Sequence, residues 1–222
     1  MKKVAILLSL IISVSAQDNI APTMTIATTG GVVTTLAGSG SEGSADGTGT
    51  ASSFNTPASV AVDGSGNVYV ADFTNHLIRK ITSAGVVTTL AGSGSEGSAD
   101  GTGTASSFNT PASVAVDGSG NVYVADFNNH LIRKITSSGV VTTLAGSGSE
   151  GSADGTGTTA SFKFPISVAV DGSGNMYVAE YGNNLIRKIT SGGVVTTLAG
   201  SGSQGSANGT GTAASFNNPY GV

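Results

Sequence analysis

Apolar residues occur along this chain in short runs that are separated by clusters of Gly, Ser, Asn and Asp. One representative stretch contains four runs rich in Val, Ile and Ala, divided by the turn sequences "DGSGN", "FTN" and "TSAG". Such runs, bounded by turn residues, predict strands joined as an antiparallel meander. The runs are nearly continuous instead of alternating, so both faces of the sheet are expected to be covered. The predicted strands are Ala58–Asp63, Val68–Asp72, His76–Ile81 and Gly85–Gly92.

The same pattern recurs every 54 residues without insertion or deletion. The sequence "GVVTTLAGSGS" begins at Gly31, Gly85, Gly139 and Gly193. Four-stranded units that repeat at about 50 residues and are covered on both faces predict a β-propeller, whose blades bury one another's faces. A β-solenoid is the alternative, but its coils are usually shorter and lack three hairpin turns per unit. The predicted fold class is therefore all-β, with four-stranded antiparallel propeller blades.

The motifs "PASVAVD", "GNVYVAD", "NHLIRKI" and "GVVTTLAG" resemble, in order and spacing, the NHL repeat of six-bladed propellers. The resemblance is strongest to secreted and surface members with long connections between blades, and it covers residues 30–222. One departure is that Leu77 and Leu131 stand where the family pattern has an arginine. The resemblance implies a ring of six blades.

The repeats supply three complete blades and two partial ones, and a ring of six such repeats would be longer than this chain. Two interpretations follow. Either the sequence is a fragment of a longer protein, or blades from another chain complete the ring. In the second case, open blade faces permit self-association. The complete blades are expected at 57–92, 111–146 and 165–200.

The N-terminal sequence "MKKVAILLSLIISVSAQ" has the features of a secretory signal peptide. Lys2 and Lys3 precede an apolar stretch, and small residues follow at Ser15 and Ala16. We therefore expect a signal peptide over 1–16, a short lead-in over 17–29, the repeats over 30–222, and a secreted or extracellular location. An uncleaved N-terminal anchor is the alternative. No other segment approaches the ~18 apolar residues of a membrane-spanning helix.

The composition argues against nucleic acid as a partner. Only 10% of the residues are charged, and removal of residues 1–16 leaves 7 basic residues against 13 acidic ones. Such a chain is poorly suited to phosphate backbones. Arg79 and Lys80 point to opposite faces of their strand, so this repeated pair makes no basic stripe. Its charges are expected either to pair with carboxylates such as Asp72 or to form a solvated rim. With no cysteine, the fold must depend on packing and backbone hydrogen bonds.

Three loop motifs could suggest a cofactor or a metal. "GSGSEG" at Gly38–Gly43 fits a dinucleotide fingerprint, but a Gly/Ser/Thr loop follows where the motif needs a helix. "DGSGN" lacks the later glycine and carboxylate of a calcium-binding EF-hand loop. Glu42 and Asp46 are an oxygen-rich calcium candidate, but Gln204 and Asn208 replace them in the fourth copy. We therefore predict no cofactor and no metal site, while Asn208 begins a possible N-glycosylation sequon.

The two histidines, His76 and His130, lie at equivalent corners between the second and third predicted strands, each four residues after an aspartate. The third copy keeps the corner but has Glu180 and Asn184 instead. A polar cap of a turn survives that exchange, whereas a catalytic base or zinc ligand does not. We therefore expect structural turn corners formed by Asp72, Asn75, His76, Asp126, Asn129, His130, Glu180, Asn183 and Asn184.

These features predict a secreted, non-catalytic binding or scaffolding module that recognises protein or glycan through its repeated loops, Gly38–Ser53 and their copies. No catalytic residue is assigned, because near-identical blades lack the asymmetry of a site built on one blade. The alternatives are a propeller enzyme, such as a metal-dependent lyase or lactonase, and a structural surface or matrix protein.

Overall fold

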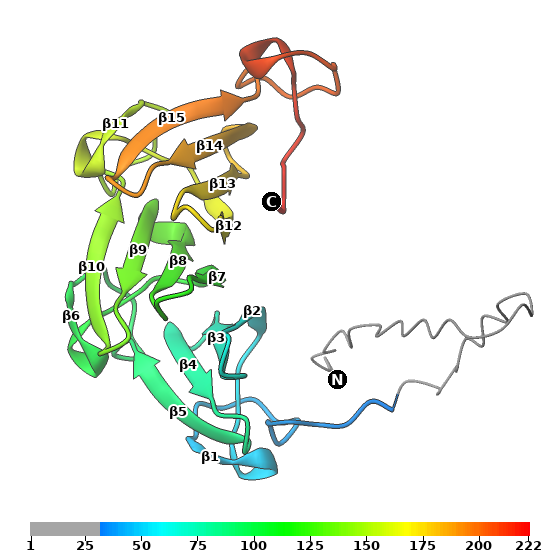
Figure 1. The fold of residues 1–222 in the computed structure, drawn as a ribbon, viewed down its shortest axis with the longest axis vertical. Helices are drawn as coiled ribbons and strands as arrows, with labels where there is room; N and C mark the ends of the chain where they lie inside the picture. Colours follow the sequence, from blue (N-terminus) through cyan, green and yellow to red (C-terminus); the bar gives the residue numbers. More distant parts are fainter. Residues whose placement is uncertain (1–31) are drawn as a thin grey trace, which may run out of the picture.

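The computed structural model describes residues 32–222, so the predicted signal peptide and lead-in lie outside the described residues. Three five-stranded antiparallel sheets stand side by side in an arc (Figure 1). The first is made of β1 (Gly47–Thr48), β2 (Pro57–Val62), β3 (Val68–Asp72), β4 (Leu77–Ile81) and β5 (Val86–Ala91). The second is made of β6 (Gly101–Thr102), β7 (Pro111–Val116), β8 (Val122–Asp126), β9 (Leu131–Ile135) and β10 (Val140–Ala145). The third is made of β11 (Gly155–Thr156), β12 (Pro165–Val170), β13 (Met176–Glu180), β14 (Leu185–Ile189) and β15 (Val194–Ala199).

The prediction of an all-β propeller is confirmed, because each sheet forms one blade. The inner strands β2, β7 and β12 line the concave side of the arc, and the outer strands β5, β10 and β15 lie on its convex side (Figure 1). Short 3₁₀ helices interrupt the connections at Gly49–Ala51, Gly103–Ala105, Phe127–Asn129, Gly157–Thr159 and Gly211–Ala213. No helix within residues 32–222 is long and apolar enough to cross a membrane.

Each blade has one strand more than the predicted four. Gly47 and Thr48 of β1 pair with Val87 and Val86 of β5, and β6 and β11 repeat this pairing in the other blades. A Gly-Thr pair carries no apolar pattern, so the sequence shows no strand there. The short strand forms because it satisfies the backbone groups of an otherwise free outer edge.

Burial follows the position of each strand in the blade. All five residues of β3 and of β8 are buried, as their continuous apolar runs predict. The outer strand β5 instead has exposed residues in alternation near its start. The core lies between adjacent blades, where for example Tyr69 and Ile78 of the first blade pack in one cluster with Val114 and Val124 of the second.

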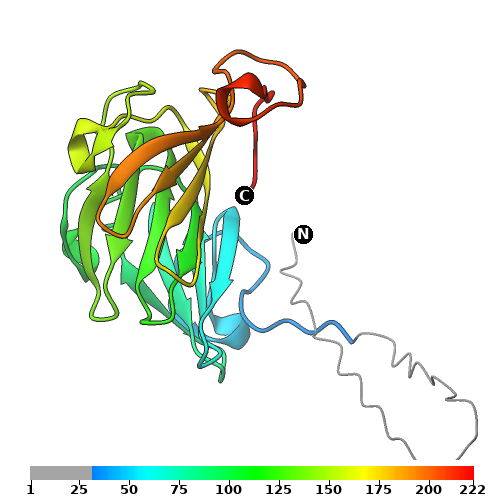
Figure 2. The same cartoon turned by 45° about the horizontal axis from the view of Figure 1, so that its top comes forward.

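The strand register gives every blade two different ends. Pro57 pairs with Asp72, and Asp72 with Leu77, so the start of β2 and the β3–β4 turn share one end with the long connections. We call this the loop end. The "DGSGN" turns at 63–67 and the β4–β5 turns lie at the other end, which we call the turn end. Figure 2 shows the hairpins of the turn end pointing to one side of the arc.

Candidate functional site

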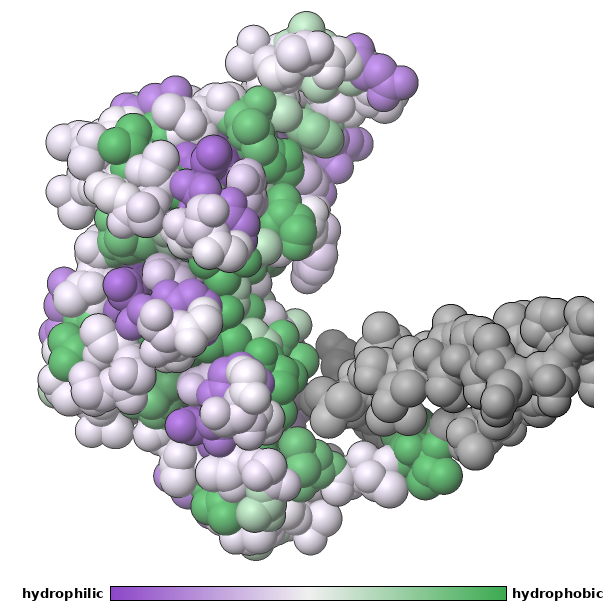
Figure 3. All heavy atoms as spheres, viewed as in Figure 1, coloured by the Kyte–Doolittle hydropathy of each residue, from purple (hydrophilic) through white to green (hydrophobic). Residues whose placement is uncertain are grey.

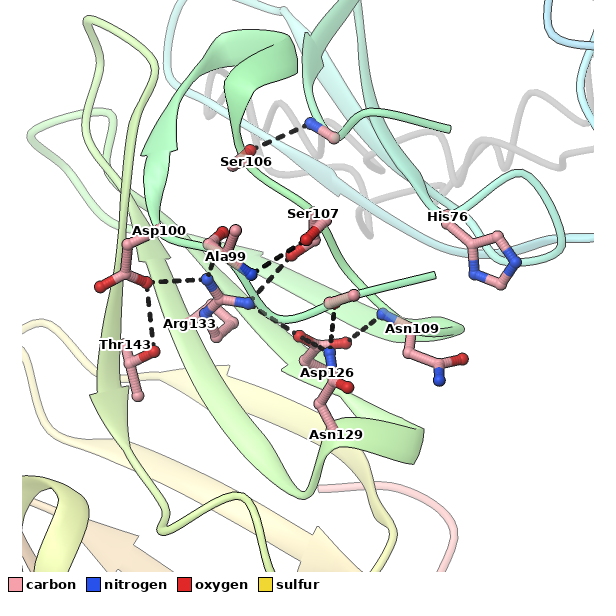
Figure 4. A network of polar contacts seen from close by, with 12 residues as sticks. His76, Ala99, Asp100, Ser106, Ser107, Asn109, Asp126, Asn129, Arg133 and Thr143 are labelled. Carbon is pink, nitrogen blue, oxygen red and sulfur yellow. Dashed lines mark hydrogen bonds and ion pairs between the residues drawn. The ribbon is translucent and has the colours of Figure 1, made fainter. Parts of the chain in front are cut away.

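A buried ion-pair network occupies the predicted corner of each blade, shown for the second blade in Figure 4. Asp126 is fully buried and accepts hydrogen bonds from the backbone N–H of Asn109 at 2.8 Å and from Asn129 Nδ2 at 2.8 Å. Arg133 Nη1 donates to Asp126 at 3.0 Å, and its Nη2 donates to Asp100 in the long loop at 2.8 Å. One guanidinium therefore connects strand β9, the corner and the loop.

The network is repeated in the first and third blades. Arg79 lies 2.9 Å from Asp72 and 2.7 Å from Asp46, where the sequence suggested a calcium candidate. In the third blade Arg187 pairs with Glu180 at 2.5 Å. The longer Glu180 side chain still accepts from Asn183 Nδ2 at 2.7 Å, so the exchange of Asp for Glu keeps the network.

The histidine position links each blade to the next one. His76, His130 and Asn184 all have a left-handed backbone, with φ of 55°, 56° and 55°, a region that His and Asn adopt more readily than most residues. A ring nitrogen or amide oxygen at this position accepts a backbone N–H from the following repeat. The bonds are Thr110 N to His76 Nδ1 at 3.0 Å, Phe164 N to His130 Nδ1 at 3.2 Å, and Asn218 N to Asn184 Oδ1 at 2.8 Å.

The structure does not bring the corner histidine and aspartate together. Asp72 is held by Asn55, Asn75 and Arg79, whereas His76 Nε2 faces Glu96 at 4.0 Å. Residues 32–222 contain no group of three or more His, Cys, Asp or Glu placed to share a metal ion. These contacts support the proposal that the corner residues are structural.

The His-to-Asn exchange within the chain predicts the outcome of a matched mutation. His130→Asn is expected to lower the free energy of unfolding by less than about 1 kcal/mol, because Asn can accept the Phe164 N–H and tolerate the left-handed backbone. His130→Ala removes the acceptor and is expected to cost about 1–3 kcal/mol. Urea unfolding followed by circular dichroism measures both. Equal losses in the two variants would show that the imidazole has a role other than this bond.

Burial changes the pKa values of the corner acids. Loss of water raises the pKa of Asp126 to about 6, although its hydrogen bonds and Arg133 oppose that rise, and it also raises the pKa of Asp72 and Glu180. Burial lowers the pKa of His130. At the turn end, hydrogen bonds from the side chain and backbone of Asn175 hold the pKa of Asp171 at about 2.

These shifts predict a stability maximum in mildly acidic solution. Between pH 7 and pH 4 the native state takes up a proton at Asp126 before the unfolded chain does, so the free energy of unfolding rises by on the order of 2 kcal/mol. His130 opposes part of this rise, because the unfolded chain protonates histidine first. Below about pH 4 the turn-end aspartates with lowered pKa values reverse the trend. Urea titrations from pH 3 to pH 8 measure the curve, and a steady loss of stability from pH 7 to pH 4 would contradict the prediction.

A second feature lies at the loop end, next to the axis of the arc. It is an open depression of about 150 Å³, which we call the axial mouth. Its floor is the start of the three inner strands, and its other lining residues are Phe73 and Tyr220. Figure 3 shows hydrophobic residues along the concave side of the arc, whereas hydrophilic residues form separate groups on the blades. The floor residues are Ala58, Ser59, Ala112, Ser113, Ile166 and Ser167.

Each blade has an aromatic residue at the same position of its loop end. Phe73, Phe127 and Tyr181 occupy the same position of their repeats, directly after β3, β8 and β13. The rings of Phe73 and Phe127 have centroids 6.5 Å apart, and Phe127 packs on Phe164 at 5.0 Å. We call Phe73, Phe127 and Tyr181 the aromatic row. The sequence predictions above do not include this row, although an aromatic residue at one position of every complete repeat is a usable signal.

The copies differ mainly at this end of the blades. The second and third repeats differ at eleven positions, and seven of these fall within 163–166 and 180–184. The blades therefore have the asymmetry that their near-identity seemed to exclude, and it is concentrated at the loop end, where Ile166 lines the axial mouth. Lys163, which occurs in this repeat only, forms an ion pair with Glu150 at 2.9 Å. The seven residues are Lys163, Phe164, Ile166, Glu180, Tyr181, Gly182 and Asn184.

Comparisons with known proteins agree with this architecture. The family model for the NHL repeat matches residues 54–81 and 108–135, so the chain carries NHL repeats and that prediction is confirmed. NHL repeat-containing protein 2 of Gallus gallus is 39% identical over 97 residues, which are 43% of this chain and 13% of that protein. Protein SUPPRESSOR OF QUENCHING 1 of Arabidopsis thaliana is 37% identical over 94 residues, 42% of this chain and 9% of that protein. The chain thus spans only about a tenth of the length of these curated relatives.

Solved structures give the same fold. An auxiliary nutrient binding protein from Bacteroides thetaiotaomicron matches with a TM-score of 0.59 and 20% identity, over 78% of this chain and 43% of that one. A protein of unknown function from the same species matches with a TM-score of 0.56 and 27% identity, over 73% of this chain and 40% of that one.

Proposed function

We propose that the chain is a secreted, non-catalytic binding module that recognises an extracellular protein or glycan at its loop end. The observation that carries the proposal is the distribution of differences between repeats. The buried corner networks recur in all three blades, while the third copy changes most at the loop end, where Ile166 lines the axial mouth and Tyr181 belongs to the aromatic row. Variation on a constant scaffold is typical of a recognition surface.

The proposal of secretion rests on the predicted signal peptide over residues 1–16. N-terminal sequencing of exported protein is expected to begin at Gln17. A mature chain that retains residues 1–16 would contradict this part of the proposal.

The proposal of a non-catalytic role rests on the engagement of the polar groups. The corner carboxylates are held in ion pairs with Arg79, Arg133 and Arg187, and the Nδ1 atoms of both histidines accept backbone N–H groups. These groups are held by the fold instead of facing a substrate.

Self-association through blade faces is a further part of the proposal. Val60 of β2 and Leu198 of β15 are 40% and 45% exposed, whereas Val114, the counterpart of Val60 in the second blade, is 4% exposed. Because the repeats are nearly identical, a blade of a second copy has a face that fits these residues. Light scattering of the 222-residue chain over a range of concentrations tests this, and a constant monomer mass would overturn it.

Two matched pairs of substitutions test which end binds. Thr74→Arg with Asn128→Arg adds two bulky cations at exposed positions of the loop end, and Ser65→Arg with Ser119→Arg adds the same groups at exposed positions of the turn end. Both proteins are measured on immobilised polysaccharides and extracellular matrix proteins. The loop-end protein is expected to lose at least tenfold in affinity, and the turn-end protein to bind as wild type. Loss in the turn-end protein alone, or no binding by wild type to any of these surfaces, would overturn the proposal.

A further inference from the structure

The floor of the axial mouth presents one serine per blade in the same orientation. The Oγ atoms of Ser59 and Ser113 accept the backbone N–H of Val114 and Val168 in the next blade, each at 3.2 Å. Ser167 Oγ accepts the N–H of Val222 at 3.3 Å. A hydroxyl that accepts in this way still has its own hydrogen to donate. The mouth therefore offers fixed hydroxyl donors beside the axis.

Aromatic and aliphatic side chains lie around these hydroxyls. Phe73 and Tyr220 line the mouth, and Tyr220 is 72% exposed. Ile166 replaces the alanine that the first two blades have at this position, and Tyr220 is its counterpart in the fourth repeat. The residue at this position is therefore Ala in the first and second blades, Ile in the third and Tyr in the fourth repeat. The side of the mouth that carries Ile and Tyr is more apolar than the side that carries the two alanines.

The mouth carries no charged lining residue among those described. The loop-end charges nearest to the lining residues in sequence, Asp72 and Lys163, are paired with Arg79 and Glu150. An ionic ligand would need a charged partner, which this lining does not supply. A ligand with apolar faces and several hydroxyl groups matches the lining, because aromatic rings pack on its C–H faces while hydroxyls exchange hydrogen bonds.

We propose that the axial mouth is a binding site for a neutral saccharide. A sugar ring packs against Tyr220 and Phe73, and its hydroxyls accept hydrogen bonds from the serines of the floor. This inference rests on the proposed function of the loop end, and it names the glycan as the partner and the mouth as its site. The volume of about 150 Å³ corresponds to a single sugar unit of a longer chain, since the depression is open.

Isothermal titration with neutral oligosaccharides of glucose, mannose, galactose and xylose tests the inference. The probe is each oligosaccharide alone, and charged uronic acid oligomers serve as the comparison. Wild type is expected to bind at least one neutral oligosaccharide at least tenfold more tightly than the charged ones. Tyr220→Ala is expected to weaken that binding at least tenfold. This exposed side chain can be removed without opening the core, and circular dichroism checks that the variant is folded.

Val194→Ala is the matched control, because it removes an exposed apolar side chain from the outer strand β15. It is expected to leave the affinity unchanged. Saccharide binding that Tyr220→Ala does not alter, or that Val194→Ala weakens equally, would overturn the assignment to the mouth. Absence of saccharide binding together with protein binding that the loop-end arginines abolish would overturn the inference and leave the proposed function standing.

Discussion

Replacing Arg133 by Met is expected to lower the free energy of unfolding by about 3–5 kcal/mol. Arg133 and Asp126 are both fully buried, and their Nη1 and Oδ2 atoms lie 3.0 Å apart. Methionine leaves the Asp126 carboxylate without its cation in a site that water does not reach. It also removes the bonds from the guanidinium to Asp100 and to the backbone of the long loop. Chemical denaturation monitored by circular dichroism measures the loss.

Lys134→Met is the matched control, because it removes the same charge from the next residue of the strand. Lys134 is half-buried, and its ammonium lies 5.9 Å from the Tyr123 ring, so we expect a loss of no more than about 1 kcal/mol. Adding Asp126→Asn to Arg133→Met removes the unpaired charge and is expected to restore part of the stability. Equal losses for the arginine and lysine variants would show that the buried pair does not hold the corner.

Gly146→Ala is expected to destabilise the second blade by about 2–5 kcal/mol. Gly146 follows β10 with φ of +108°, and a Cβ added there would lie 2.5 Å from the carbonyl oxygen of His130. It would also lie 3.1 Å from the side chain of Leu131. Both contacts involve the corner, so neither can move without disturbing the link between blades.

Gly148→Ala separates backbone strain from this steric clash. Gly148 has φ of +80°, but nothing lies within 4 Å of the added Cβ. Only the strain remains, and the expected loss is about 1 kcal/mol. Thermal unfolding of the two variants side by side makes the comparison. A loss at Gly148 as large as that at Gly146 would contradict the role of the close approach between Gly146 and His130.

Much of the fold could be predicted because the strands are local patterns. The run Val68–Asp72 is the observed β3 without adjustment, since a continuous apolar segment between two turn sequences leaves few alternatives. His76 was predicted as the first residue of a strand, but its left-handed backbone places it in the turn, and β4 begins at Leu77. Strand β1 could not be predicted, because its pairing depends on an edge formed by β5.

The candidate sites could be predicted only in part. The exchange of His130 for Asn184 between repeats indicated a polar turn corner, and the expected pairing of Arg79 with Asp72 is observed at 2.9 Å. The bond from Thr110 to His76 spans 34 residues and depends on how successive blades pack. The aromatic row and the axial mouth likewise form only when the blades stand around a common axis. Sequence spacing alone does not give that arrangement.

The proposed function requires that the buried corner networks hold the fold while exposed loop-end residues, including some that differ between repeats, bind the ligand. Converting Lys163, Phe164 and Ile166 to the second-repeat residues, as Lys163→Asn, Phe164→Thr and Ile166→Ala, tests it directly. Gly192→Ser, the same kind of conversion at the turn end, is the control. The measurement is binding to the neutral oligosaccharides by titration calorimetry. We expect a loss of at least tenfold in affinity in the triple variant, with cooperative unfolding retained, and wild-type binding in the control. Unchanged binding by the folded triple variant would contradict this requirement.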